Sequence, residues 1–283
     1  MAEATGSGGY DLHTHSVFSD GTMRPGEIAR EAAELGLAGF ALTDHDTVDG
    51  WEEAREAARA VGVDFLPGIE ITTKHNGRSR HLLGYGIDPA AGELFEALAE
   101  VRSSRLGRAR EMVRRLSANY AITWDAVVGE EDARTVGRPH IADALVAAGY
   151  FADRSTAFAE ILHPRSPYYL GTYAIETVEA IRLVNAAGGA AALAHPAAFR
   201  QRTPTSAREL REIAAAGLWA VELEHPENRA DWVPALVETA SELGLAVTGS
   251  SDYHGAGKPN RLGQHTTAPA LVERLRERVA TPR

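Results

Sequence analysis

Apolar and polar residues follow two different spacings in the first part of the chain. Residues 24–35 and 51–61 carry apolar side chains at helical spacing, and a glycine follows each segment. Short apolar runs at 38–46 and 63–70 end in polar residues, which is typical of buried strands. The alternation of strand and helix predicts parallel βα units, in which helices cover the strands.

The segment after residue 70 predicts a hairpin. Asn76-Gly77 is a strong signal for a two-residue turn, and such a turn pairs Thr72 with His81. Glu70 then lies on the same face as His81, at the diagonal position about 7 to 8 Å away. A metal ion bonded to both at about 2 Å can bridge that separation, so we expect Glu70 and His81 to act as a pair.

The middle of the chain has a different character. Apolar residues follow helical spacing over 94–116 and are interleaved with arginines, and further helices are predicted at 139–148 and 155–162. We therefore expect residues 89–170 to form a helical insertion, a lid. Most of its arginines are expected on solvated helix faces. Arg138 precedes a helix start, where backbone N–H groups and a guanidinium both favour phosphate oxygens.

The strand and helix pattern resumes after the insertion. Helices are predicted at 177–187, 206–216 and 232–243, and strands at 190–196, 219–226 and 245–255. We expect three parts: a mobile N-terminal tail at 1–9, a barrel domain made of 10–88 and 171–283, and the lid at 89–170.

Candidate metal ligands recur where these predicted strands end. In a strand over 10–15, His13 and His15 point to the same face, because side chains alternate. Other histidines and acids take comparable strand-end or turn positions, where α/β barrels build their active sites. The full set is His13, His15, Asp20, His45, Glu70, His81, His195, Asp252 and His254. Such a set is hard to explain as packing and indicates a metal site.

Composition narrows the chemistry. The 283 residues are 44% hydrophobic and include no cysteine, so any metal must be held by His, Asp and Glu. The net charge of −10 argues against binding long nucleic acid, although a metal-filled cleft can hold a short phosphate-bearing ligand. Apolar runs are shorter than the ~20 residues of a membrane span, and residues 1–9 lack signal-peptide features. We expect a cytoplasmic protein without membrane contact.

Several motifs resemble those of the PHP (polymerase and histidinol phosphatase) superfamily. They are Asp11-Leu12-His13-Thr14-His15, Ser19-Asp20-Gly21, Thr43-Asp44-His45, Gly68-Ile69-Glu70, Ala194-His195-Pro196 and Gly249-Ser250-Ser251-Asp252-Tyr253-His254-Gly255. A closer resemblance, to the branch with 3′,5′-nucleoside bisphosphate phosphatases and short-RNA exoribonucleases, rests on Gly137-Arg138-Pro139-His140-Ile141-Ala142 and Val221-Glu222-Leu223-Glu224-His225-Pro226. The resemblance implies an α/β fold, a distorted (β/α)7 barrel, with two to three divalent ions of manganese, iron, zinc or magnesium.

The resemblance also implies roles for individual residues. One metal would take His13, His15, Glu70 and Asp252; a second would share Glu70 and add His81 and His195; a third would take Asp20, His45 and His254. Glu70 is thus expected to bridge two metals as a catalytic residue, and His225 is a candidate leaving-group acid or substrate contact. The candidate phosphate contacts are Arg138, Arg200 and Arg202. Asp11, Asp44 and Asp46 are expected to support the ligands.

These residues predict a phosphoesterase. Three divalent ions would bring about six positive charges against three carboxylates, which suits a phosphate dianion, and a metal-activated water can attack phosphorus in line. We expect hydrolysis of a phosphomonoester of a small nucleotide, such as a 3′,5′-bisphosphate. Alternatives are a 5′-3′ exoribonuclease acting on a short oligonucleotide, a histidinol-phosphate phosphatase and, from another class, a metal-bound accessory module without turnover. The physiological metal and the oligomeric state stay open.

Overall fold

The computed structural model describes residues 8–129, 135–201 and 203–280. The first part of the sheet and its helices are β1 (Tyr10–Thr14), α1 (Pro25–Glu34), β2 (Gly39–Leu42), α2 (Trp51–Val61), β3 (Asp64–His75) and β4 (Arg78–Tyr85). Helices alone follow, namely α3 (Gly92–Leu116), α4 (Trp124–Val128), α5 (Arg138–Ala147) and α6 (Arg154–Glu160). The last part consists of β5 (Ile175–Glu176), α7 (Thr177–Ala186), β6 (Ala190–Leu193), α8 (Ala207–Ala214), β7 (Ala220–Glu224), α9 (Val233–Glu242), β8 (Ala246–Gly249), the short 3-10 helix η1 (Gly255–Gly257) and α10 (Pro269–Ala280).

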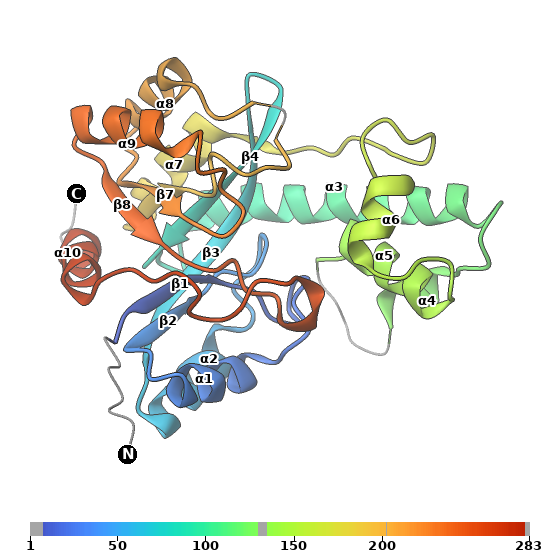
Figure 1. Ribbon diagram of the computed structural model, residues 1–283, viewed down its shortest axis with the longest axis horizontal. Helices are drawn as coiled ribbons and strands as arrows, with labels where there is room; N and C mark the ends of the chain where they lie inside the picture. The colour runs from blue at the N-terminus through green and yellow to red at the C-terminus, as the bar shows by residue number, and fades with distance from the viewer. Residues whose placement is uncertain (1–7, 130–134, 202, 281–283) are drawn as a thin grey trace.

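The strands form one mixed sheet that nearly closes into a barrel surrounded by helices (Figure 1). Their order is β1-β2-β3-β4-β6-β7-β8, with β5 paired to β3. The two ends of the sheet meet where Tyr253 N donates to His13 O at 3.1 Å and His15 N donates to Tyr253 O at 2.8 Å. The α/β barrel predicted from the sequence is therefore confirmed. The barrel is distorted because β4 runs antiparallel to both of its neighbours.

The hairpin between β3 and β4 has the predicted register. Asn76 and Gly77 both have positive φ, of 50° and 74°, as a tight two-residue turn requires. Thr72 pairs with His81 as predicted, and Glu70 pairs with Leu83. Since β4 is antiparallel, its first residues lie at the edge where the parallel strands end. This direction brings His81 to the same edge as the strand-end candidates.

Side-chain alternation separates the inside of the sheet from its helix-covered outside. Along β2, Ala41 packs in a cluster with Leu12 and Leu83, whereas Phe40 and Leu42 belong to the cluster that includes the helices α1 and α2. Alanines of β6 and β7 share the inner cluster, together with apolar residues of α10. Helix α10 lies beside β1 and β8 in Figure 1, and it was not among the predicted helices.

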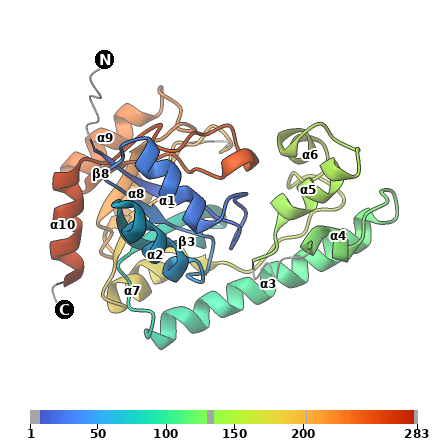
Figure 2. The same cartoon turned by 90° about the horizontal axis from the view of Figure 1, so that it is seen from below.

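Helix α3 links two hydrophobic cores. Leu94 and Leu98 in its first half are buried in the core of the barrel, whereas Ala109 and Met112 in its second half are buried with residues of α4, α5 and α6. Figure 2 shows α3 running away from the barrel with α4, α5 and α6 over its far end. The helical content predicted for 89–170 is present, and its role as a separate lid stays a prediction.

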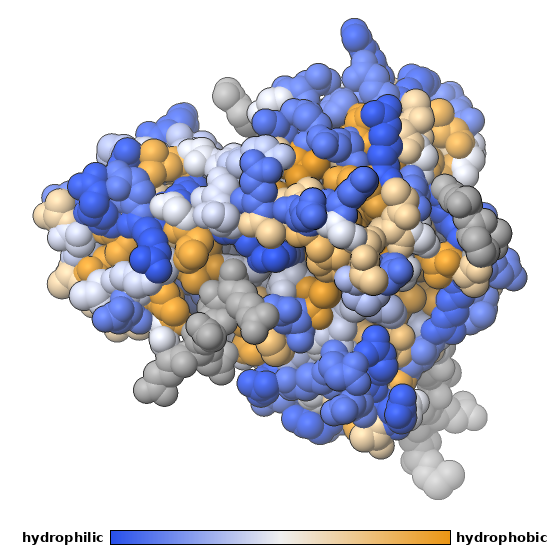
Figure 3. All heavy atoms as spheres, turned by 180° about the vertical axis from the view of Figure 1, so that it is seen from behind, coloured by the Kyte–Doolittle hydropathy of each residue, from blue (hydrophilic) through white to orange (hydrophobic). Residues whose placement is uncertain are grey.

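The remaining sequence expectations concern the N-terminus and the membrane. Residues 1–7 of the predicted tail lie outside the described residues, while Gly9 O accepts from Ala38 N at 3.0 Å beside β2. Among the described helices, none is long and apolar enough to cross a bilayer. On the face in Figure 3, hydrophilic residues cover much of the surface and apolar residues form small patches between them.

Candidate metal centre

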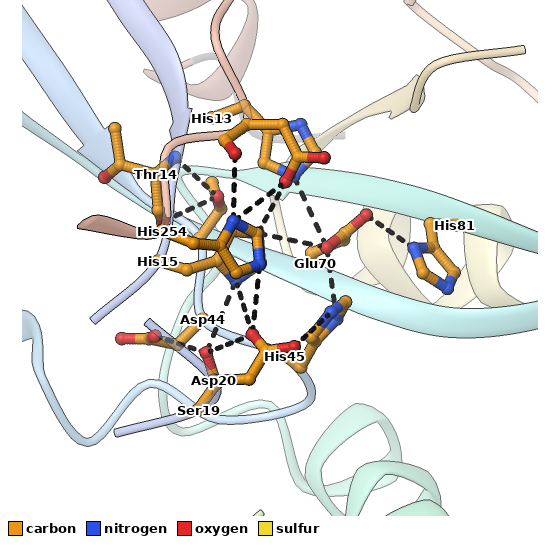
Figure 4. Close-up of polar contacts among 12 residues, drawn as sticks. His13, Thr14, His15, Ser19, Asp20, Asp44, His45, Glu70, His81 and His254 are labelled. Atoms are coloured by element: carbon orange, nitrogen blue, oxygen red, sulfur yellow. Dashed lines mark hydrogen bonds and ion pairs between the residues drawn. The ribbon is translucent and has the colours of Figure 1, made fainter. Parts of the chain in front are cut away.

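The nine predicted ligands lie together at one end of the barrel. Figure 4 labels seven of them, from β1, β3, β4 and the loops that follow β1, β2 and β8, and their side chains gather around a common centre. Ligand atoms lie within 4.8 Å of one another in the groups His13, His15, Glu70 and Asp252; His15, Asp20, His45 and His254; and His45, Glu70 and His81. The ninth, His195, places Nε2 3.1 Å from Glu70 Oε1. The first group is the expected set for one metal. His15 adds to the expected third set, and His45 approaches the pair Glu70 and His81.

Glu70 is the centre of this arrangement, and its two oxygens face different imidazoles. Its Oε2 lies between 3.1 and 3.3 Å from nitrogens of His13, His15 and His45. Its Oε1 lies 2.7 Å from His81 Nδ1 and 3.1 Å from His195 Nε2. A carboxylate with one oxygen toward each of two ligand sets has the geometry needed to bridge two cations.

The cluster contains buried nitrogens that lack hydrogen-bond partners. These are His13 Nε2, His15 Nε2, His45 Nδ1 and His254 Nε2. Buried polar atoms in folded proteins are nearly always hydrogen-bonded, and an unsatisfied one costs about 1–3 kcal/mol. Neutral imidazole nitrogens and carboxylate oxygens are suitable ligands for divalent manganese, iron, zinc or magnesium. The residues present therefore fit divalent cations.

Comparison with known proteins identifies the family. The PHP domain model matches residues 11–128. Over 258 residues the chain is 33% identical to the 3′,5′-nucleoside bisphosphate phosphatase of Chromobacterium violaceum, covering 90% of each protein. The chain belongs to the PHP family. It is also 30% identical to the 5′-3′ exoribonuclease of Haemophilus influenzae, covering 87% of this chain and 89% of the relative.

A solved structure extends the comparison to three dimensions. A protein of Bifidobacterium adolescentis described as a metal-dependent phosphoesterase shares 42% identity with this chain and superposes with a TM-score of 0.93, covering 95% of this chain and 96% of the other. The predicted superfamily is therefore confirmed. With its buried cluster of His, Asp and Glu, this PHP protein is a metal-dependent phosphoesterase, and so a hydrolase.

Charged side chains of the metal centre shift one another's pKa values strongly. Burial alone would lower the pKa of His15, but the carboxylates of Asp252 and Glu70 raise it to about 9. Burial alone would likewise raise the pKa of Glu70, but nearby imidazoles, with His81 foremost, hold it well below its usual range. Burial lowers the pKa of His254 to about 4, with help from Lys258 and His15. Without cations, the carboxylates thus raise the pKa of His13 and His15, whereas burial lowers the pKa of His45, His195 and His254.

Buried aspartates hold the loops that carry the candidate ligands. Asp44 accepts from Ser16 N at 2.7 Å and from Ser19 Oγ at 2.6 Å, which fixes the turn between His15 and Asp20. Asp11 accepts from Ser251 N at 3.0 Å and from Gly263 N at 2.8 Å, and thereby holds the loop of Asp252. Asp46 accepts from Thr72 N at 2.7 Å. These contacts fit the supporting roles expected for the three aspartates.

Glu222 is a buried residue of the centre to which sequence reasoning gave no role. Its Oε1 lies 2.9 Å from His13 Nδ1, so it orients the ring whose Nε2 faces Glu70, and its Oε2 accepts from His195 N at 2.8 Å. Burial alone would raise the pKa of Glu222, but His13 and His225 lower it strongly. The available signal was a carboxylate in the middle of an apolar strand, between Val221 and Leu223.

The backbone is strained at the centre. Among described residues other than glycine, φ is positive at Asn76 of the hairpin and at three residues of the centre, Asp46, His195 and Asp252, with values of 56°, 28° and 54°. Such conformations cost on the order of 1–3 kcal/mol each and persist where the surrounding contacts enforce them. They turn the side chains of His195 and Asp252 toward Glu70 and His13.

The predicted catalytic and substrate residues lie at different distances from the cluster. Arg200 Nη2 lies 3.1 Å from His195 Nε2, and Arg202 lies outside the described residues. Arg138 lies among the insertion helices, where Nη1 donates to Leu162 O at 3.0 Å. His225 has a fully buried side chain whose Nε2 is 3.6 Å from Asp252 Oδ2. His225 Nε2 is thus close to Asp252 without a hydrogen bond to it, and the role of His225 as an acid or substrate contact stays a prediction.

Proposed function

We propose that this PHP protein is a phosphomonoesterase that acts on small nucleotides, with the 3′-phosphate of a nucleoside 3′,5′-bisphosphate as the preferred group. The proposal is supported by the 3′,5′-nucleoside bisphosphate phosphatase relative and by a second cationic cluster beside the metal centre. A phosphomonoesterase with two anion-binding regions can hold one phosphate while it cleaves the other. The arginines of the insertion provide the observation that carries this substrate assignment.

Two to three divalent ions are expected in the centre. When bound, they supply Lewis acidity and positive charge for the phosphoryl oxygens. Glu70 would be shared between them, His13, His15 and Asp252 would complete one set, and the other residues of the cluster would hold the rest. Glu222 would keep His13 in the orientation that presents Nε2 to the cation.

The second cluster consists of Arg105, Arg108 and Arg138, and we call it the arginine cluster. Arg105 is 7% exposed, and its Nη1 lies 2.6 Å from Asp46 Oδ2, next to the candidate ligand His45. Burial, together with the charges of Arg105 and Arg138, lowers the pKa of Arg108 to about 10. Among the described residues, Arg108 and Arg138 form no ion pair with a carboxylate. The positive charges of the three arginines repel one another, and an incoming phosphate would relieve this repulsion.

Aromatic rings flank Arg138 of the arginine cluster. The guanidinium of Arg138 lies 5.2 Å from the ring centroid of Phe158 and 5.3 Å from that of Tyr169. The insertion also reaches the metal-ligand loops, since Arg154 Nη1 donates to Asp20 O at 2.9 Å and Thr135 Oγ1 donates to Phe18 O at 3.0 Å. These contacts support the proposal that the insertion covers a substrate bound between the two clusters.

Replacing Arg138 with alanine should remove most of the preference for a bisphosphate over the matching monophosphate. A charged hydrogen bond to the remote phosphate is worth about 1.5–3 kcal/mol, which corresponds to roughly tenfold to a hundredfold in kcat/KM. The measurement compares adenosine 3′,5′-bisphosphate with adenosine 3′-phosphate. Arg114→Ala is the control, because Arg114 is an exposed α3 arginine paired with Glu111. Equal losses on both substrates would place Arg138 at the scissile phosphate instead.

A phosphate-release screen tests the proposed function directly. Adenosine 3′,5′-bisphosphate, short 5′-phosphorylated RNA and histidinol phosphate are compared with manganese added. Release of one phosphate from the bisphosphate at the highest kcat/KM is the expected result. Preferred release of mononucleotides from RNA would favour the exoribonuclease, which the Haemophilus influenzae relative makes the second candidate. No turnover of any phosphate ester by metal-loaded protein would favour a binding module.

A further inference from the structure

Lys258 lies at the edge of the metal centre, and the proposed function does not yet use it. It directly follows η1 on the loop after β8, and its Nζ donates to Asp252 Oδ2 at 2.6 Å. The same ammonium lies 3.6 Å from Glu227 Oε1. Its side chain is 26% exposed, compared with 2% for Asp252. Lys258 therefore stands between a buried candidate ligand and the solvent.

A row of charged side chains extends from Lys258 across the centre. Glu227 lies near Lys258 through Oε1 and pairs with Arg200 through Oε2. Arg200 in turn lies 3.1 Å from His195 Nε2. Two cations thus share one carboxylate, and each also contacts a candidate metal ligand. Lys258, Glu227 and Arg200 together carry one positive charge in excess, and this row ends at Asp252 on one side and at His195 on the other.

The ammonium of Lys258 has donor capacity to spare and is held in place. An ammonium carries three N–H donors, and among the described residues its only hydrogen bond goes to Asp252. The loop around it is anchored, because Asn260 Nδ2 donates to Ser251 O at 2.8 Å and Ala256 N donates to Thr22 Oγ1 at 2.8 Å. A fixed, partly exposed cation with free donors beside a metal centre suits an anionic ligand.

We propose that Lys258, together with Arg200, binds a non-bridging oxygen of the phosphoryl group that is cleaved, and that Glu227 positions both cations. The ligand class is a phosphate dianion, either a terminal phosphomonoester or inorganic phosphate, and no covalent bond to Lys258 is formed. This inference rests on the proposed phosphomonoesterase function. The competing explanation is that Lys258 only holds Asp252 in the orientation needed for a metal.

The variant Lys258→Met separates these explanations. It removes the charge at similar side-chain length, so the KM for the phosphomonoester and the inhibition constant of inorganic phosphate should both rise about tenfold while metal content stays unchanged. Lys258→Arg should recover part of the loss. Lys74→Met is the matched control. Lys74 lies on β3 with a side chain that is 42% exposed, and its Nζ is 3.8 Å from Oε1 of Glu176 on β5. Melting temperatures report whether each variant is folded.

Chemical labelling gives a readout that needs no turnover. The sequence has two lysines, Lys74 and Lys258, so acetylation of each side chain in the manganese-loaded protein can be followed by mass spectrometry. Inorganic phosphate should slow acetylation of Lys258 several-fold and leave Lys74 unchanged. Equal rates with and without phosphate would overturn the proposal, as would metal loss in Lys258→Met without a change in phosphate inhibition. Protection of Lys258 in a protein that hydrolyses no nucleotide would support this inference and refute the proposed function.

Discussion

Replacing Glu70 with glutamine is expected to lower phosphoester hydrolysis at least about a hundredfold while the fold survives. Glu70 Oε2 faces His13 and His15, whereas Oε1 faces His81 and His195. Glutamine keeps the shape of the side chain, but it removes the negative charge and replaces one oxygen with an NH₂ group that cannot bind a cation. One half of the bridge is thereby lost. Steady-state rates at saturating manganese, measured alongside metal content, provide the test.

Glu209 supplies the matched control for this variant. Glu209 is also a buried carboxylate, and it lies on α8, outside the ligand cluster. Its Oε1 is 2.7 Å from Nη2 of Arg80. Glu209→Gln should lower the melting temperature, because it weakens a buried ion pair, and should leave metal content unchanged. Activity of Glu70→Gln within a few-fold of wild type at equal metal content would show that Glu70 does not bridge two cations.

Periodicity explains why much of the centre could be predicted from the sequence. His13 and His15 are two residues apart on a strand, so their common direction follows from local geometry alone. The hairpin register followed from Asn76-Gly77, because the turn type fixes which residues pair, and it brought Glu70 and His81 together correctly. Both predictions needed only short-range rules.

The supporting parts of the centre depend on contacts that periodicity does not reveal. Glu222 meets His13 across 209 residues of sequence, and Lys258 reaches Asp252 from an irregular loop. The positive φ of His195 is enforced by packing, since no glycine or asparagine marks the position. The position of Arg138 among the insertion helices depends in turn on how α5 packs against α3. Such features follow from tertiary structure, which overrides local preference.

Removing the divalent ions is expected to abolish hydrolysis and to destabilise the protein. Buried imidazole nitrogens of the centre, such as His45 Nδ1 and His254 Nε2, have no hydrogen-bond partner without a cation. A ligand that binds only the folded state at a hundred times its dissociation constant stabilises it by about 2.7 kcal/mol. Dialysis against a chelator should therefore lower the melting temperature by roughly 5 to 10 °C. Re-addition of manganese, iron, zinc or magnesium should restore both properties, and an unchanged melting temperature would contradict metal binding at this cluster.

The melting temperature of the metal-free protein should also fall between pH 6.5 and 9. Although burial alone would lower it, the carboxylates of Asp252 and Glu70 raise the pKa of His15 to about 9, from about 6.5 in an unfolded chain. A histidine whose pKa is higher in the folded state stabilises that state fully at pH values below its pKa in the unfolded chain. This stabilisation is lost as the pH rises through the pKa in the folded state. For His15 the loss is about 3 kcal/mol.

Other histidines of the centre do not offset that loss, and bound metals should remove it. Burial lowers the pKa of His195 and His254 to about 3 and 4, so these two residues change the stability only at pH values below about 6.5. Divalent ions displace the proton of His15, because a metal ligand must be deprotonated. The metal-loaded protein should therefore keep a nearly constant melting temperature over the same range. If the melting temperature instead falls equally with and without metal over this pH range, the expectation is contradicted, and protons on the imidazoles do not take the place of bound cations in this centre.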